Sequence, residues 1–174
     1  MTSLERLWAG WRSEYIERVT GSTEVGCVFC AILTSGLPDD ETYVVWRDPQ
    51  GTAVAILNAY PYASGHLLVM PTRHVGELED LDGPEEEAIW QGVRDAVRAL
   101  KAAYRPDGLN VGANLGHVAG AGVPGHFHMH VLPRWVGDTN FMTSVAETRV
   151  LPEALSVSAA KIRAGWPQNR SLTD

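Results

Sequence analysis

The stretch GHFHMHVLPRW (residues 125–135) contains three of the chain's six histidines, at alternate positions. They are His126, His128 and His130. Alternate residues of a β-strand share one face, so the imidazoles would project from one side and the apolar residues between them from the other. The apolar side has a clear role in packing against a helix. Core packing does not explain the histidines, because a buried imidazole needs a partner for each ring nitrogen. If this were the solvent-exposed face of an edge strand, Thr, Lys or Glu would be more usual there.

Two kinds of chemistry remain open for this face, metal binding and phosphoryl transfer. Residues i and i+2 of a strand lie roughly 6.5–7 Å apart, so neighbouring rings can converge on one ion, whereas the outer pair hardly can. The spacing therefore favours a division of roles along the strand over a single site with three histidine ligands.

The rest of the chain predicts an α+β fold with an antiparallel sheet of about five strands, one long helix and terminal helices. The predicted strands are residues 43–48, 51–58, 65–71, 108–116 and 127–133. The long helix is predicted over residues 84–104, where apolar residues recur at steps of three or four behind a proline and three glutamates. A weaker helix is predicted over residues 153–166. The glycine-rich loop (residues 116–125) leads into a strand and not a helix, which excludes a dinucleotide-binding fingerprint.

Composition limits the class of protein. The chain has 174 residues, 45% of them hydrophobic, which suffices for one domain with a real core. Its net charge of -7 argues against a nucleic-acid partner. The N-terminal residues lack the apolar core of a signal peptide, and no run has the length of a membrane span, so no membrane partner and a cytoplasmic location are expected.

The chain's two cysteines, Cys27 and Cys30, form a CxxC pair. Such a pair is half of a tetrahedral zinc site, and two small buried thiols are the alternative. A thioredoxin-like redox role is disfavoured, because the pair does not precede a long helix in a βαβ unit.

The histidine stretch matches the motif His-φ-His-φ-His-φ-φ at every position, where φ is apolar, and so resembles the histidine-triad (HIT) family. The segments GCVFCAI, AILNAYPYASGHLLVMPTRHVGELEDL, NVGANLG and HVLPRWVGDTNF are similar to family segments, in the same order. The resemblance covers about residues 27–142, which leaves residues 1–26 as an N-terminal helical extension and 143–174 as a C-terminal helical tail. LNAYPY, NLG and PRWVGDTNF are most similar to bacterial diadenosine tetraphosphate phosphorylase-like members.

The resemblance implies a role for each histidine. His128 would attack the α-phosphorus of a nucleotide and form a nucleotidyl-histidine intermediate, and His130 would bind phosphate oxygens. The family's substrate-contacting positions correspond to Asn58, Asn114 and Trp135, while amides around Gly120, Gly122 and Gly125 would approach phosphate. A structural zinc ion would be held by Cys27, Cys30, His74 and His126. His66 and His117 are expected to be bystanders, and a homodimer is implied by resemblance alone.

The chain departs from the family pattern at one place. Many HIT hydrolases and phosphoramidases carry Gln and Ser or Thr where this chain has Gly122 and Val123. The departure favours a phosphorylase that uses inorganic phosphate and converts diadenosine tetraphosphate to ATP and ADP. The alternatives are a nucleoside phosphoramidase or dinucleoside polyphosphate hydrolase, and a non-catalytic nucleotide-binding zinc protein.

Overall fold

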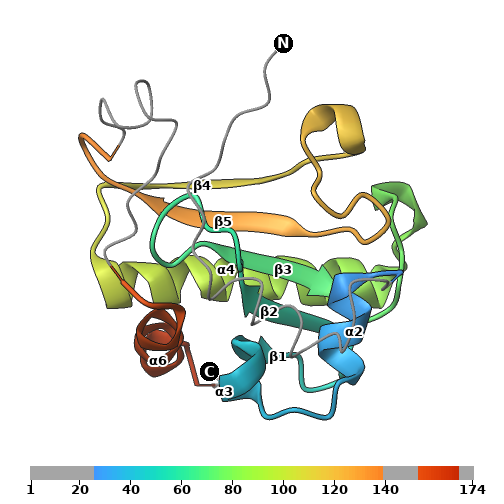
Figure 1. Cartoon of the computed structure of the whole chain (residues 1–174), viewed down its shortest axis with the longest axis horizontal. Helices are drawn as coiled ribbons and strands as arrows, with labels where there is room; N and C mark the ends of the chain where they lie inside the picture. The colour runs from blue at the N-terminus through green and yellow to red at the C-terminus, as the bar shows by residue number, and fades with distance from the viewer. Residues whose placement is uncertain (1–25, 139–152, 169–174) are drawn as a thin grey trace, which may run out of the picture.

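The computed structural model describes residues 26–138 and 153–168 and has the predicted α+β architecture (Figure 1). Its elements are α2 (Val28–Thr34), α3 (Asp39–Thr42), β1 (Val44–Arg47), β2 (Ala53–Leu57), β3 (Leu67–Pro71), η1 (Leu78–Asp80), α4 (Gly83–Tyr104), β4 (Gly108–Ala113), η2 (His117–Ala119), β5 (Met129–Arg134) and α6 (Leu155–Gly165). The five strands form one sheet in the order β1-β2-β3-β5-β4, and every pairing is antiparallel. The predicted N-terminal helix and the boundary at residue 142 lie outside the described residues.

The long helix α4 covers one face of the sheet (Figure 1). Its N-terminus is a capping box, in which the Asp82 side chain accepts from the Glu85 amide and the Glu85 carboxylate accepts from the Asp82 amide. Arg73 also pairs with the buried Glu85 carboxylate at 2.6 Å, and this lowers the pKa of Glu85. These contacts join the first turn of α4 to the segment that follows β3.

The apolar face of the histidine stretch packs as predicted. Phe127, Met129 and Val131 are buried in the core cluster that contains Ile89, Val93 and Leu100 of α4. The strand β5 itself begins at Met129, two residues later than predicted, because the amide of Phe127 donates to the carbonyl of Val75 and not to a neighbouring strand.

The opposite face of the sheet has its own apolar cluster. The short helix α2 contributes Phe29 and Ile32 to it, and these pack on side chains of β1, β2 and β3. Phe29 stands beside the histidines, with its ring centroid 5.2 Å from that of His128. The histidine face of this stretch is therefore bordered by apolar residues rather than open to solvent.

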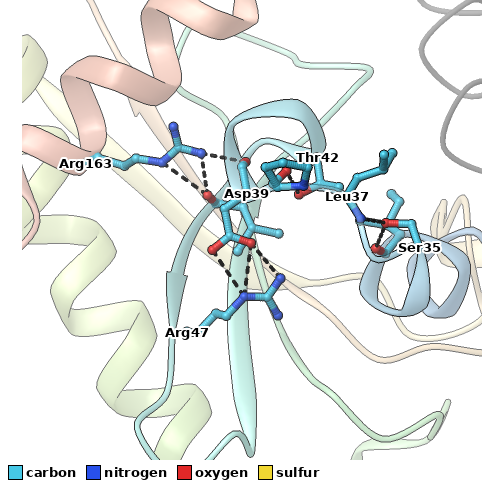
Figure 2. Close-up of polar contacts among 9 residues, drawn as sticks. Ser35, Leu37, Asp39, Thr42, Arg47 and Arg163 are labelled. Atoms are coloured by element: carbon cyan, nitrogen blue, oxygen red, sulfur yellow. Dashed lines mark hydrogen bonds and ion pairs between the residues drawn. The ribbon is translucent and has the colours of Figure 1, made fainter.

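The predicted C-terminal helix is confirmed as α6, which lies beside α4 and the β1 edge (Figure 1). The Arg163 guanidinium donates to the carbonyl oxygens of Val44 and Asp39, so it joins α6 to the start of β1 and to α3 (Figure 2). The Asp39 carboxylate in turn accepts from Arg47 at 2.7 Å (Figure 2). Among the described residues, none of the helices combines the length and the apolar character that crossing a bilayer requires.

Candidate active site and metal site

His128 has a defined tautomer. Its Nδ1 lies 2.7 Å from the carbonyl oxygen of His126, which can only accept, so Nδ1 carries the proton. The lone pair is therefore on Nε2. Burial lowers the pKa of His128, which keeps the ring neutral near pH 7. A buried, neutral imidazole with an unprotonated Nε2 is a competent nucleophile.

His130 is joined to a histidine that was expected to be a bystander. The Nε2 of His66 lies 2.9 Å from the Nδ1 of His130, and His66 is fully buried. The expectation for His66 was wrong. The antiparallel pairing of β3 with β5 sets Leu68 opposite His130, and this brings the residue just before β3 to the histidine face.

The hydrogen bonds run in one direction along this pair. The backbone amide of Tyr62 donates to the Nδ1 of His66 at 3.1 Å, so His66 carries its proton on Nε2 and donates to His130. His130, accepting at Nδ1, carries its own proton on Nε2 when neutral. Burial, together with the nearby His128, lowers the pKa of His130 to about 4, so the neutral form holds at neutral pH.

The Nε2–H of His130 is a buried donor with no hydrogen-bond partner among the described residues. An unpaired buried donor costs free energy unless a ligand satisfies it. The ring centroids of His128 and His130 are 5.0 Å apart, so the ring that carries this donor neighbours the His128 ring. The pair can attack a phosphorus atom and donate to its oxygens.

Asn58 lies in the same network. Its side-chain oxygen accepts from the amide of Tyr60 at 2.8 Å, and its Nδ2 lies 3.4 Å from the Nδ1 of His66. The predicted substrate-binding residue thus contacts His66, which in turn is hydrogen-bonded to His130.

The predicted metal ligands meet at one place. The Nδ1 of His126 lies 3.4 Å from the Sγ of Cys27 and 3.6 Å from that of Cys30, and the Nδ1 of His74 lies 3.3 Å from Cys30. All four ligand atoms lie within 4.8 Å of one another. Around a tetrahedral zinc ion, neighbouring sulfur and nitrogen ligands are roughly 3.5 Å apart. These four residues can therefore hold a metal ion.

The tautomer of His126 fits this role. Its Nε2 lies 2.9 Å from the carbonyl oxygen of Pro71 and donates to it, which leaves the Nδ1 lone pair directed at the two sulfurs. Burial lowers the pKa of His126 and raises that of the Cys30 thiol. A cation would stabilise the thiolate that burial disfavours.

The remaining predicted residues are spread over a wider area. In the glycine-rich loop, the Asn114 side chain donates to the carbonyl of Gly120, which has a φ of +95°. Gly122 and Gly125 are both exposed. A Cβ on Gly125 would lie 3.8 Å from the His74 ring, so Gly125 borders the cysteine–histidine cluster. Trp135 packs edge-on against Tyr104 at 6.2 Å, at the C-terminal end of α4.

Comparison with known proteins agrees with this arrangement. A model of the HIT domain matches residues 40–136, which is more than half of the chain. The chain belongs to the HIT family. An AP-4-A phosphorylase of Mycobacterium tuberculosis is 38% identical over 169 residues, covering 94% of this chain and 85% of that protein.

Solved HIT proteins share the fold. A Hit-like protein of Bartonella henselae, described as involved in cell-cycle regulation, aligns with a TM-score of 0.65 at 26% identity, over 80% of this chain and 96% of that one. A Zn-bound histidine triad protein of Mycobacterium smegmatis aligns with a TM-score of 0.64 at 30% identity, over 80% and 92%. HIT membership and the histidine geometry together support a nucleotide-processing protein.

Proposed function

We propose that the chain is a nucleotidyl transferase that acts on dinucleoside polyphosphates through a nucleotidyl intermediate on His128. The observation that carries the proposal is the hydrogen bond from His128 Nδ1–H to the His126 carbonyl, because it leaves Nε2 free to attack. His130 has an unpaired Nε2–H, and its ring centroid lies 5.0 Å from that of His128, so it is suited to bind the phosphate oxygens.

Two displacements account for the reaction. In the first, the His128 Nε2 forms a bond to the α-phosphorus of diadenosine tetraphosphate, the bond to the bridging oxygen breaks, and ATP leaves. In the second, an oxygen of inorganic phosphate forms a bond to the same phosphorus, the bond to His128 breaks, and ADP is released. Two displacements on one nucleophile divide a difficult reaction into easier steps.

Phosphate, rather than water, is the proposed acceptor. The similar M. tuberculosis protein is named an AP-4-A phosphorylase. In addition, Gly122 and Val123 stand where many HIT hydrolases carry Gln and a hydroxyl residue, so a side chain that would orient water is missing at those two positions. Backbone amides of the same loop could bind a second phosphate.

Zinc at the cysteine–histidine cluster is proposed as a structural ion. Four protein ligands, Cys27, Cys30, His74 and His126, would close the coordination sphere and leave no position for a metal-bound water. The ion would then join α2 and the segment after β3 to the start of the histidine stretch, beside the nucleophile.

A homodimer is proposed through the β4 edge of the sheet. The strand β4 is one of the two terminal strands, and its Val111 is 44% exposed, while Trp90 on α4 is 58% exposed. Unpaired strand edges and exposed aromatic groups are typical of surfaces that a second copy covers. Light scattering after gel filtration would give the mass of a dimer if this is correct.

The decisive experiment is product analysis with diadenosine tetraphosphate in the presence and absence of inorganic phosphate. Phosphorolysis predicts ATP and ADP only when phosphate is present, whereas AMP and ATP formed equally well in both would identify a hydrolase. The variant His128→Ala distinguishes the proposed enzyme from a non-catalytic nucleotide-binding protein. It should bind nucleotide but lose turnover by at least ~1000-fold and form no adduct.

A further inference from the structure

The side chain of Tyr62 covers the hydrogen-bonded pair His66 and His130. Its ring centroid lies 4.8 Å from that of His66 and 6.2 Å from that of His130, and it is tilted only 15° from the His130 ring. Tyr62 is 47% exposed, whereas His66 is fully buried. His130 itself is half-buried, with its Nε2 buried, so the Tyr62 ring covers one side of the pair and stands between His66 and solvent.

The same residue also determines the direction of the hydrogen bonds beneath its ring. The Tyr62 amide donates to His66 Nδ1, and His66 Nε2–H donates to His130 Nδ1. A proton on the Nδ1 of His130 would face the proton on His66. His66 cannot move its own proton to Nδ1 without facing the Tyr62 amide. With both rings neutral, only one pair of tautomers satisfies the Tyr62 amide, His66 and His130 together. It places a proton on the Nε2 of His130.

We propose that Tyr62 is a positioning residue: its ring excludes water from the His66–His130 pair and thereby holds His130 as a neutral donor directed at the substrate phosphate. The identity of the acceptor rests on the proposed function, but the effect of Tyr62 on His130 does not. The neutral form depends on water exclusion, since water could hydrate a charged His130 and replace its bond to His66.

The neutral state of His130 is not due to a charged side chain on either strand that flanks it. The strands β3 and β4 carry no ionisable residue. Among the described residues, the titratable groups whose rings contact that of His130 are His66, His128 and Tyr62. Burial is the largest cause of the lowered pKa of His130, and the nearby His128 is the second. Tyr62 is the member of this group that stands on the solvent side.

The test compares Tyr62→Ala and Tyr62→Phe in the full-length protein as purified. The titration of the His130 ring is followed by proton NMR without nucleotide, with its resonance assigned from His130→Asn. Tyr60→Ala is the matched control, because Tyr60 is 50% exposed in the same loop and its backbone amide, which the substitution keeps, makes its bond to Asn58.

The proposal predicts that Tyr62→Ala raises the midpoint of the His130 titration by about one pH unit. Tyr62→Phe, which keeps the ring, should match the wild type, and so should Tyr60→Ala. An unchanged His130 midpoint in Tyr62→Ala would overturn the proposal, as would an equal shift in Tyr60→Ala. A wild-type protein that turns over no nucleotide would refute the proposed function alone, because the NMR titration needs no turnover.

Discussion

The carbonyl oxygen of His126 lies 2.7 Å from the Nδ1 of His128, so the backbone of one residue fixes the tautomer of the next histidine along the face. The side chain of His126 is turned the other way, toward Cys27 and Cys30. One residue thus joins the cysteine–histidine cluster to the proposed nucleophile. Any displacement of His126 moves both its side chain and the carbonyl that holds His128.

Loss of the metal ligands should therefore affect stability first and catalysis second. We expect Cys30→Ser to bind no zinc and to lower the unfolding temperature by several degrees, because the free energy of binding a structural metal contributes to folding. Elemental analysis and thermal unfolding of the purified protein measure both effects. Cys30→Ser with a full zinc content, or wild-type protein whose unfolding temperature does not fall after chelation, would contradict the structural role.

His66 and His130 should act as one unit. His66→Ala removes the donor to the His130 Nδ1 and should lower kcat by about 10- to 100-fold, with a smaller change in KM. His130→Ala should cost more. In the double variant the two losses should be far from additive, because each single change already breaks the same hydrogen bond. Additive losses would show that the two histidines contribute independently.

The strand period and the resemblance together predicted much of this site. Alternation placed Phe127 and Met129 in the core and the histidines on the other face, which the structure confirms. It also favoured a division of roles over one metal site with three histidine ligands, and the side chain of His126 alone among them turns to the cysteines. Local periodicity carries this information because it depends on backbone geometry alone.

His66 could not be placed by the same reasoning. It lies 64 positions before His130 in the chain, and the two meet only because of the pairing between β3 and β5. Such a register depends on contacts distant in sequence. The available signal was a polar, titratable residue directly before the apolar strand Leu67–Pro71, where a fully buried side chain requires a partner.

His130 should contribute to a loss of stability in mild acid. Its folded pKa is about 4, below the value near 6.5 of an unfolded histidine, so between these pH values the unfolded chain binds more protons. The free energy of unfolding therefore rises with pH across this window. The contribution of His130 to it is lost as the pH falls from about 6.5 toward 4. Urea unfolding at pH 7.5 and pH 5 measures the loss. His130→Asn should lose less stability over the same interval, and an equal loss would assign the effect to other groups.

Gly65 should be the least replaceable glycine near the site. It has a φ of +83°, and a Cβ there would lie 2.7 Å from Cε2 of Tyr104. Gly65→Ala should therefore combine backbone strain with a clash against a ring that is held by a hydrogen bond to Glu153, at a cost of roughly 2–4 kcal/mol of unfolding free energy. Since Gly65 precedes His66, kcat should fall as well.

Gly36 offers a matched control for this substitution. Its φ is +72°, close to that of Gly65, but a Cβ added there would meet no atom within 4 Å beyond its own chain neighbours. Gly36→Ala should therefore show the strain alone, about 1–2 kcal/mol, with kcat unchanged. Urea unfolding and steady-state kinetics on the two variants separate the backbone strain from the clash. Equal losses of stability in both would mean that Tyr104 moves aside and that the contact with Gly65 does not hold the turn before His66.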